Sequence, residues 1–132
     1  MRFLLMMNSP RDGYDRYLSW PKEVLEANVA FMMAFSRRLK ETGELVATEG
    51  LASPAQARRV RAGADGMPIT DGVFPETKEF LAGYWMVEVP SAERAYQIAA
   101  EASRAPGVGG DGLPDHLWIE VREVMGSHQS LK

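Results

Sequence analysis

The stretch GYWMVEVPSAERAYQIAAEASR, residues 83–104, joins an aromatic-rich strand directly to a helix. Residues 83–89 form a short apolar run with aromatic and β-branched side chains, which is typical of a buried strand. Pro90 ends that strand, and Ser91 is suited to cap a helix predicted over 92–104. The apolar face of this helix consists of small residues that allow close packing: Ala95, Ile98, Ala99 and Ala102. This strand-helix unit is one half of the fold.

The other half lies at the start of the chain. Phe3 to Met7 is an apolar run that stops too early for a signal peptide, so we interpret it as a buried strand. Residues 11–17 are expected to form a loop. A long helix is predicted to follow, with Ser19 as its cap, Pro21 in its first turn and Gly43 as its stop. Its apolar face contains Val24, Leu25, Phe31, Met32, Phe35 and Leu39.

Shorter elements connect and complete these units. Residues 44–51 are predicted to form a strand, and residues 57–62 another. Gly63, Asp65-Gly66 and Asp71-Gly72 favour turns and indicate a hairpin-like excursion within residues 52–80. Residues 75–80 are expected to form a short helical turn. The last strand contains Leu117, Ile119 and Val121 in alternation with polar or aromatic residues.

The predicted order is β-α-β, a hairpin insertion, and β-α-β. Two such units form one antiparallel sheet with both helices on one face, the ferredoxin-like arrangement of the α+β class. Residues 1–125 are therefore expected to form a single domain, and residues 126–132 a tail.

Both faces of the central strands are predicted to be buried. Phe3 and Leu5 alternate with Leu4 and Met6, and the aromatic strand is also apolar on both sides. Helices cover only one face, and soluble proteins avoid large exposed apolar patches. We therefore expect a homodimer that packs through the second face. The alternative is that the hairpin folds back over this face.

Composition excludes several classes of function. The 132 residues carry a net charge of -3, whereas duplex-binding domains have a strong basic excess, so we expect no nucleic-acid partner. No apolar run approaches a membrane span, and the absence of cysteine fits a reducing, cytoplasmic location. The two histidines, His116 and His128, form no metal signature, and no nucleotide-binding motif is present. We therefore expect neither a metal nor a cofactor.

Asn28 is the most informative polar residue. It lies three residues after Leu25 and three before Phe31, which places it inside the apolar face of the long helix. A buried amide without hydrogen bonds costs about 1–3 kcal/mol. Asn28 is therefore either satisfied by backbone or water at the junction of helix and sheet, or it contacts a ligand in a cavity.

The segment DGVFPETKE, residues 71–79, concentrates charged and turn-forming side chains. Its carboxylates have the chemistry of acid-base groups, or they complement a helix N-terminus. Asp71, Glu76 and Lys78 are its candidate ligand contacts, together with Asn28. A basic patch at Arg58, Arg59 and Arg61 is interpreted as the charged edge of a strand, with an anion site as the alternative.

The same segment, followed by Gly83 and an aromatic strand, resembles the signature Asp-Gly-Pro-Phe-x-Glu-x-Lys-Glu of the DGPF branch of the YCII-related family. The resemblance extends to the opening strand, the long helix, Gly43-Glu44-Leu45, Val89-Pro90 and residues 119–122. It implies a dimeric α+β barrel of ferredoxin-like subunits.

The resemblance implies little about activity. Some DGPF proteins are linked to genes for extracytoplasmic-function sigma factors. Distant YCII relatives are thought to use a histidine-aspartate pair in a cleft, and one kind removes chloride from a hydroxylated aromatic compound. This chain departs from the pattern at Val73, which replaces the signature proline, and at Asn28, which replaces a histidine found in many relatives. Asparagine cannot act as a general base near neutral pH.

Three functional hypotheses remain. The first is a small-molecule cleft between the sheet and the first helix, with Asn28 and Asp71 as polar contacts, and with or without catalysis. The second is a regulatory or scaffolding role through protein contacts. The third is a degenerate relative that has lost its chemistry.

Overall fold

The computed structural model describes residues 1–72, 79–107 and 117–126. The strands are β1 (Arg2–Pro10), β2 (Leu45–Gly50), β3 (Arg58–Ala62), β4 (Pro68–Gly72), β5 (Glu79–Glu88) and β6 (Ile119–Glu123). The helices are α1 (Gly13–Leu18), α2 (Lys22–Glu41) and α3 (Ala92–Ala102), with a short 3₁₀ helix η1 (Pro54–Gln56). The predicted β-α-β, hairpin, β-α-β succession is confirmed.

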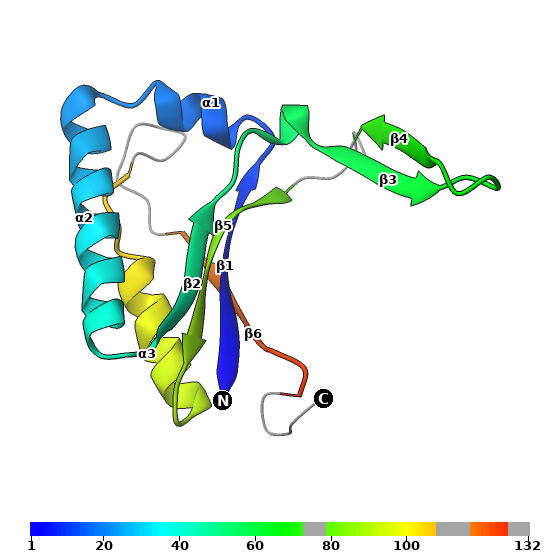
Figure 1. Ribbon diagram of the computed structural model, residues 1–132. Coiled ribbons are helices and arrows are strands. Elements are labelled where there is room, and N and C mark those ends of the chain that lie inside the picture. Colours follow the sequence, from blue (N-terminus) through cyan, green and yellow to red (C-terminus); the bar gives the residue numbers. More distant parts are fainter. Residues whose placement is uncertain (73–78, 108–116, 127–132) are drawn as a thin grey trace.

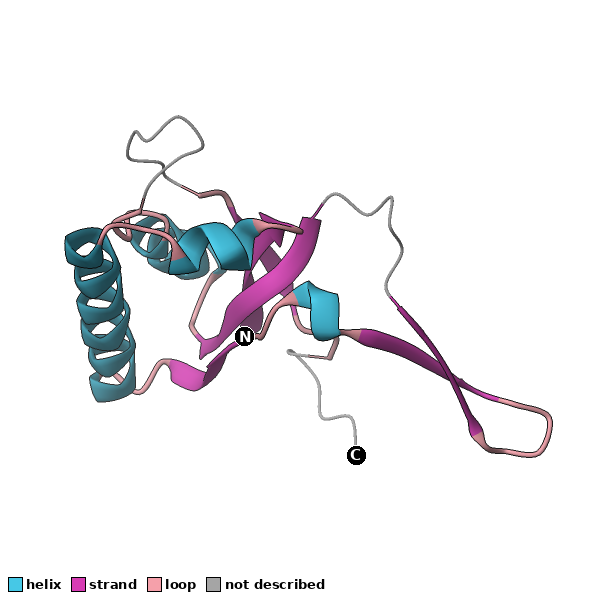
Figure 2. Cartoon of the chain, turned by 90° about the horizontal axis from the view of Figure 1, so that it is seen from above, coloured by secondary structure: helices cyan, strands magenta, loops and turns pink. Residues whose placement is uncertain are grey.

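The main sheet has four antiparallel strands in the order β2-β5-β1-β6. Each long helix therefore connects two strands that have a third strand between them. Both α2 and α3 lie on the same side of this sheet (Figures 1 and 2). The chain is an α+β protein, as its sequence predicts.

The core lies between the sheet and the helices. The buried side chains come from alternate positions of β1 and β5 and from the inner faces of α2 and α3. They are Phe3, Leu5, Phe35, Leu39, Trp85, Val87, Val89, Ala95, Ile98, Ala99 and Ala102. Every member of the predicted small-residue face of α3 is buried, and Ser91 caps this helix by accepting a hydrogen bond from the Arg94 N–H at 3.2 Å.

Helix α2 ends as predicted but begins differently. Gly43 has a φ of 80°, a left-handed conformation that glycine adopts without strain, and it follows the last turn. Ser19 does not cap α2, because its hydroxyl donates to the Arg16 carbonyl at 2.8 Å and ends α1. Pro21 directly precedes the first helical residue.

Two other local expectations are wrong. Residues 13–18 form α1, although a helix of this length gives no periodic signal in the sequence. Glu79 and Phe80 belong to β5 and not to a helical turn, because they pair with Pro10 and Ser9 of β1. The preceding residues of that expected turn, 75–78, lie outside the described part of the chain.

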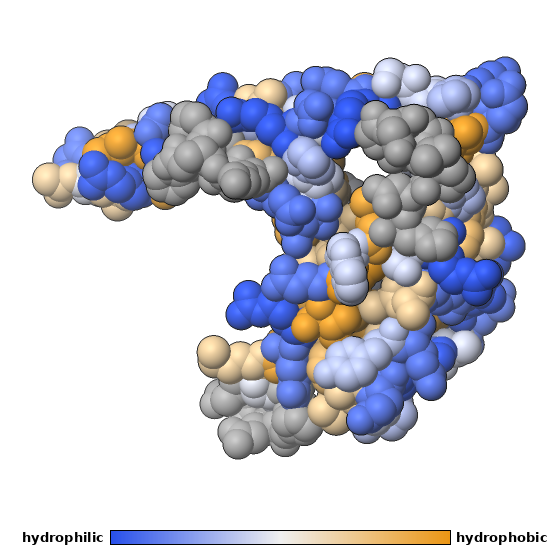
Figure 3. All heavy atoms as spheres, turned by 180° about the vertical axis from the view of Figure 1, so that it is seen from behind, coloured by the Kyte–Doolittle hydropathy of each residue, from blue (hydrophilic) through white to orange (hydrophobic). Residues whose placement is uncertain are grey.

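The sheet face opposite the helices is only partly covered. By register, Leu4 and Met6 of β1 share this face with Tyr84 and Met86 of β5, and all four are half-buried. Hydrophobic residues are visible beside the hollow between the projecting hairpin and the body of the molecule (Figure 3). We call the sheet face formed by Leu4, Met6, Tyr84 and Met86 the open face.

The β3–β4 hairpin does not cover the open face. All residues of β3 and β4 are exposed, and the hairpin projects away from the body (Figure 1). The interpretation in which this hairpin folds back over the sheet is therefore wrong for the described residues. Within those residues, no helix is long and apolar enough to cross a membrane.

Candidate ligand-binding cavity between the sheet and helix α2

A cavity of about 640 Å³ opens between the main sheet, α1, α2 and the segment that follows α3. This volume is in the range of sites that hold small organic ligands. Its lining is mostly apolar and aromatic, with a few polar groups. The side chains that the argument below uses are Tyr14, Arg16, Tyr17, Trp20, Asn28, Met32, Ser36, Glu49 and Trp85.

Asn28 lies in the wall of this cavity and is 8% exposed. Its Nδ2 donates a hydrogen bond to the Pro106 carbonyl at 2.8 Å, across 78 residues of sequence. This bond sets the orientation of the amide, because a carbonyl oxygen can only accept. The nitrogen therefore faces Pro106, and Oδ1 faces away from it.

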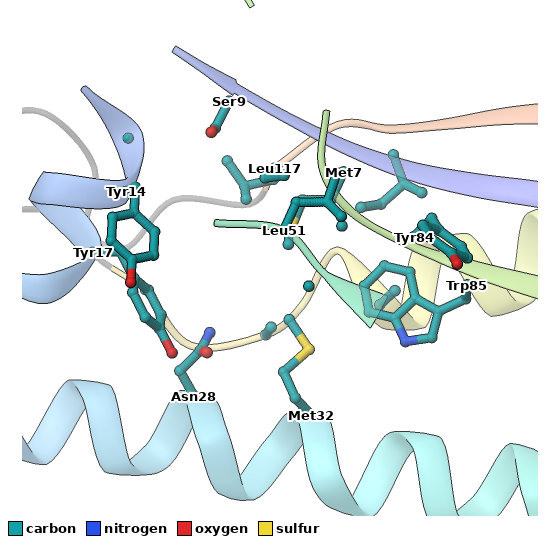
Figure 4. Close-up of a pocket in the computed structure, with 18 of the residues that line it drawn as sticks. Met7, Ser9, Tyr14, Tyr17, Asn28, Met32, Leu51, Tyr84, Trp85 and Leu117 are labelled. Atoms are coloured by element: carbon teal, nitrogen blue, oxygen red, sulfur yellow. The ribbon is translucent and has the colours of Figure 1, made fainter. Parts of the chain in front are cut away.

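The Oδ1 atom of Asn28 is an open acceptor. It receives no hydrogen bond from any residue in the described ranges, and it is not sealed from solvent. Figure 4 shows the amide directed into the cavity, with Tyr17 beside it. The backbone thus satisfies one N–H of Asn28, as the first interpretation from the sequence expects, and Oδ1 has no protein partner in the described structure.

Aromatic rings form opposite walls. From the α1 side come Tyr14, Tyr17 and Trp20, of which the last two meet edge to face with ring centres 5.1 Å apart. From the sheet comes Trp85, whose ring packs edge-on against Phe35 at 5.5 Å and is thereby held in place. Met32 lies between these walls on α2 (Figure 4).

The segment after α3 is held from two sides. Asn28 binds it through Pro106, and Trp20 packs against Gly107 so closely that an added Cβ would lie 2.9 Å from the indole ring. Only glycine allows this approach. One hydrogen bond and one aromatic contact thus join this part of the cavity wall to α2 and to the residue that follows α1.

Charge is scarce in the lining. The charged side chains among the described lining residues are Arg16 and Glu49, and both are exposed. Arg16 faces Asp12 at 3.5 Å on the same short helix. No cluster of His, Asp or Glu in the described ranges is arranged to hold a metal ion. The cavity is consequently a neutral, aromatic site with one buried polar group.

Asp71 lies elsewhere. It is on β4, its side chain is 72% exposed, and it does not line the cavity. It accepts hydrogen bonds from its neighbour Gly72 N–H at 2.8 Å and from Arg59 at 2.6 Å, and these bonds lower the pKa of its carboxyl. The described structure does not bring Asn28 and Asp71 together.

Of the remaining candidate residues, only the basic patch lies in the described part of the chain. Glu76 and Lys78, like His116 and His128, lie outside the described residues. The basic patch belongs to the exposed hairpin, where Arg58 donates to the Ala57 carbonyl at 2.8 Å and Arg59 pairs with Asp71.

The sequence did not point to the aromatic wall of the cavity. Tyr14 and Tyr17 fall in a segment whose sequence indicates a loop, and Trp20 precedes the α2 helix as the structure has it. The residue in the sequence that could have indicated this wall is Gly107, because glycine is favoured where the backbone lies very close to another group. The partner of that approach is an indole 87 positions earlier in the numbering, which only the fold reveals.

Comparison with known proteins identifies the family of this chain. Residues 1–110 match the family model of the YCII-related domain. An uncharacterised protein of Rhizobium meliloti (strain 1021) is 32% identical over 92 residues, which cover 69% of this chain and 74% of the relative. The chain therefore belongs to the YCII-related family.

Proposed function

We propose that this protein binds a small molecule in the cavity between the main sheet and α2. The observation that carries this proposal is the buried Asn28, which lines a cavity of about 640 Å³ and whose Oδ1 has no protein partner in the described structure. An acceptor without a protein partner in the wall of a mostly apolar cavity is a polar group that can orient a ligand there.

Binding is better supported than acid-base catalysis at this position. An amide neither gains nor loses a proton near neutral pH, so Asn28 orients a ligand and cannot act as a base. Asp71, the other polar contact expected in the cleft, is engaged by Arg59 on the hairpin. The histidine-aspartate chemistry of distant relatives thus has no counterpart at these two positions.

We also propose that two copies associate through the open face as a dimeric α+β barrel. The half-buried Leu4, Met6, Tyr84 and Met86 support this, since they leave an apolar centre on a sheet face without a helix. The ion pair between Arg2 and Glu88 (2.9 Å) lies at the end of the same face and adds a polar border.

A regulatory or scaffolding role is the second candidate. One observation favours it: the β3–β4 hairpin is exposed along its whole length and presents Arg58 and Arg61. Affinity capture from a lysate of the source organism, with the intact chain and a hairpin-deleted chain as baits, tests this role. A partner retained only by the intact chain supports it, and recovery of the chain alone contradicts it.

The binding proposal is tested by a thermal-shift screen against small aromatic acids, lactones, nucleotides and uncharged heterocycles. A ligand at about 100 times its dissociation constant stabilises the folded state by about 2.7 kcal/mol. A hit that is weakened in Asn28→Ala, and unchanged in the surface variant Met33→Ala, supports the cavity. A hit that binds both variants equally places the ligand elsewhere.

A further inference from the structure

The open acceptor, the aromatic walls and the lack of buried charge together specify the ligand of the cavity. We infer that the cavity selects an uncharged, planar ring molecule that presents one N–H or O–H donor to Asn28 Oδ1. This inference rests on the proposed binding function and adds the chemical class of the ligand.

The need for a donor follows from the amide geometry. One N–H of Nδ2 is used by the Pro106 carbonyl at 2.8 Å, whereas Oδ1, which can only accept, receives no hydrogen bond from a described residue. If a ligand places an acceptor against Oδ1, two hydrogen-bond acceptors face each other without a donor, in a position that is partly shielded from water. A ligand with a donor satisfies an atom that the described protein residues leave open.

The preference for a flat ring follows from the walls. Tyr17 and Trp20 on one side and Trp85 on the other offer aromatic surfaces, and Met32 supplies a polarisable, adaptable contact between them. The rings are held by their own contacts, Trp20 against Tyr17 and Trp85 against Phe35. Preformed aromatic walls bind planar molecules at a low entropic cost.

The preference for an uncharged molecule follows from the lining. Arg16 and Glu49 are the charged lining residues in the described ranges, and both are exposed to solvent, with Arg16 already facing Asp12. A charge carried past them to Asn28 would lose hydration without gaining a counter-ion. Charged analogues of a good ligand are therefore disfavoured.

The test compares three bicyclic probes by ligand-observed NMR titration: indole, benzothiophene and indole-3-carboxylate. Indole and benzothiophene have nearly the same shape, but only indole has an N–H donor. We expect benzothiophene to bind at least about fivefold more weakly than indole, as the loss of one hydrogen bond to a buried acceptor requires. Indole-3-carboxylate should bind at least about tenfold more weakly than indole, because its charge is desolvated.

The variant Asn28→Leu removes the acceptor while keeping a similar volume. The ratio of the indole and benzothiophene dissociation constants should fall to about one in this variant, and a ratio cancels any general change in cavity shape. Ser36→Ala is the matched control, because it removes a polar group from the same helix face and the same cavity. The wild-type ratio should persist there.

Three results overturn the inference. They are equal binding of indole and benzothiophene to the wild type, a ratio that survives in Asn28→Leu, and tighter binding of the carboxylate than of indole. If the wild type binds all three probes equally and Asn28→Leu binds none of them, the cavity remains a ligand site. Only the proposed chemical class of the ligand is then rejected. Failure of indole to bind also rejects the class, while the broader screen decides the binding function separately.

Discussion

At the scale of single residues, Asn28 combines a structural hydrogen bond with an acceptor that has no protein partner in the described structure. Its amide nitrogen holds the segment after α3 through Pro106, and its oxygen remains open to the cavity. Its position inside the apolar face of α2 is predictable from helical spacing. The division of roles between its two ends is not, because Pro106 reaches it only in the folded chain.

Glu44 is the residue whose ionisation is most clearly coupled to the fold. Arg94 donates to both of its carboxylate oxygens, at 2.7 and 2.8 Å, and joins the start of β2 to the start of α3. These hydrogen bonds hold the pKa of Glu44 below its ordinary value of 4.5, against the opposing effect of burial and with help from Thr42. The ion pair therefore favours the folded state whenever Glu44 is charged.

We predict that Glu44→Gln lowers the free energy of unfolding by about 1 kcal/mol at pH 7. Because the folded-state pKa is lowered, the stabilisation is present above pH 4.5 and is lost as the pH falls through that lowered value. Urea unfolding from pH 7 to pH 3 should show the wild type and variant converging at the acidic end. A constant difference across this range would contradict the assignment, and the exposed Glu41→Gln serves as control.

Gly107 is the residue on which the position of Trp20 depends. We predict that Gly107→Ala destabilises the protein by about 1–2 kcal/mol, because its Cβ would lie 2.9 Å from the indole. Gly50→Ala is the matched control, since a Cβ there meets nothing within 4 Å. Thermal unfolding followed by circular dichroism measures both. Equal melting temperatures for the two variants would show that Trp20 does not pack on Gly107.

At the scale of elements, the two β-α-β units and the hairpin are stabilised very differently. Strands β1 and β5 pair along nearly their whole length and are buried on the helix side. In the described part of the chain, β3 and β4 pair with each other, and none of their residues is buried. An isolated two-stranded hairpin is marginally stable in water.

We therefore predict a large difference in amide hydrogen exchange between these elements. The amides of β3 and β4 should exchange about a hundredfold faster or more than those of β1 and β5, because local opening of the hairpin exposes no core. Exchange followed by mass spectrometry on proteolytic fragments separates the segments. Slow exchange in the hairpin would mean that it packs against another surface, such as a second copy.

At the scale of the whole molecule, the described helices cover only one face of the main sheet. Helices α2 and α3 bury one face, while the open face keeps an apolar centre. Met86 stands at this centre, opposite Leu4 of β1 and Ala47 of β2. A charge placed there would remain without a counter-ion once a second copy covered it.

We predict that Met86→Glu converts a dimer into a monomer, with at least about a hundredfold rise in the dissociation constant. Sedimentation velocity should report twice the 14.6 kDa of one chain for the wild type and a single chain for the variant. Met33→Glu makes the same change on the outer surface of α2, where the side chain is 62% exposed, and should stay dimeric. A wild type that sediments as a single chain would refute the dimer.

The sequence by itself determined the parts of this protein that depend on local patterns. Alternation and apolar runs define β1 and β5, helical spacing places Asn28 on the inner face of α2, and Ser91 and Gly43 mark helix ends through capping geometry. Turn residues locate the hairpin. Each of these signals involves residues within a few positions of one another, so a single sequence contains it.

Only the tertiary structure decided what depends on distant residues. Helix α1 is too short for a periodic signal, β5 begins earlier than its pattern suggests because β1 pairs with it, and Asp71 is separated from Asn28 by a hairpin that projects outward. One wall of the cavity is the segment at Pro106 and Gly107, which contacts Asn28 and Trp20 from distant parts of the chain. Such contacts join residues far apart in the chain, and neither composition nor spacing encodes which of them will meet.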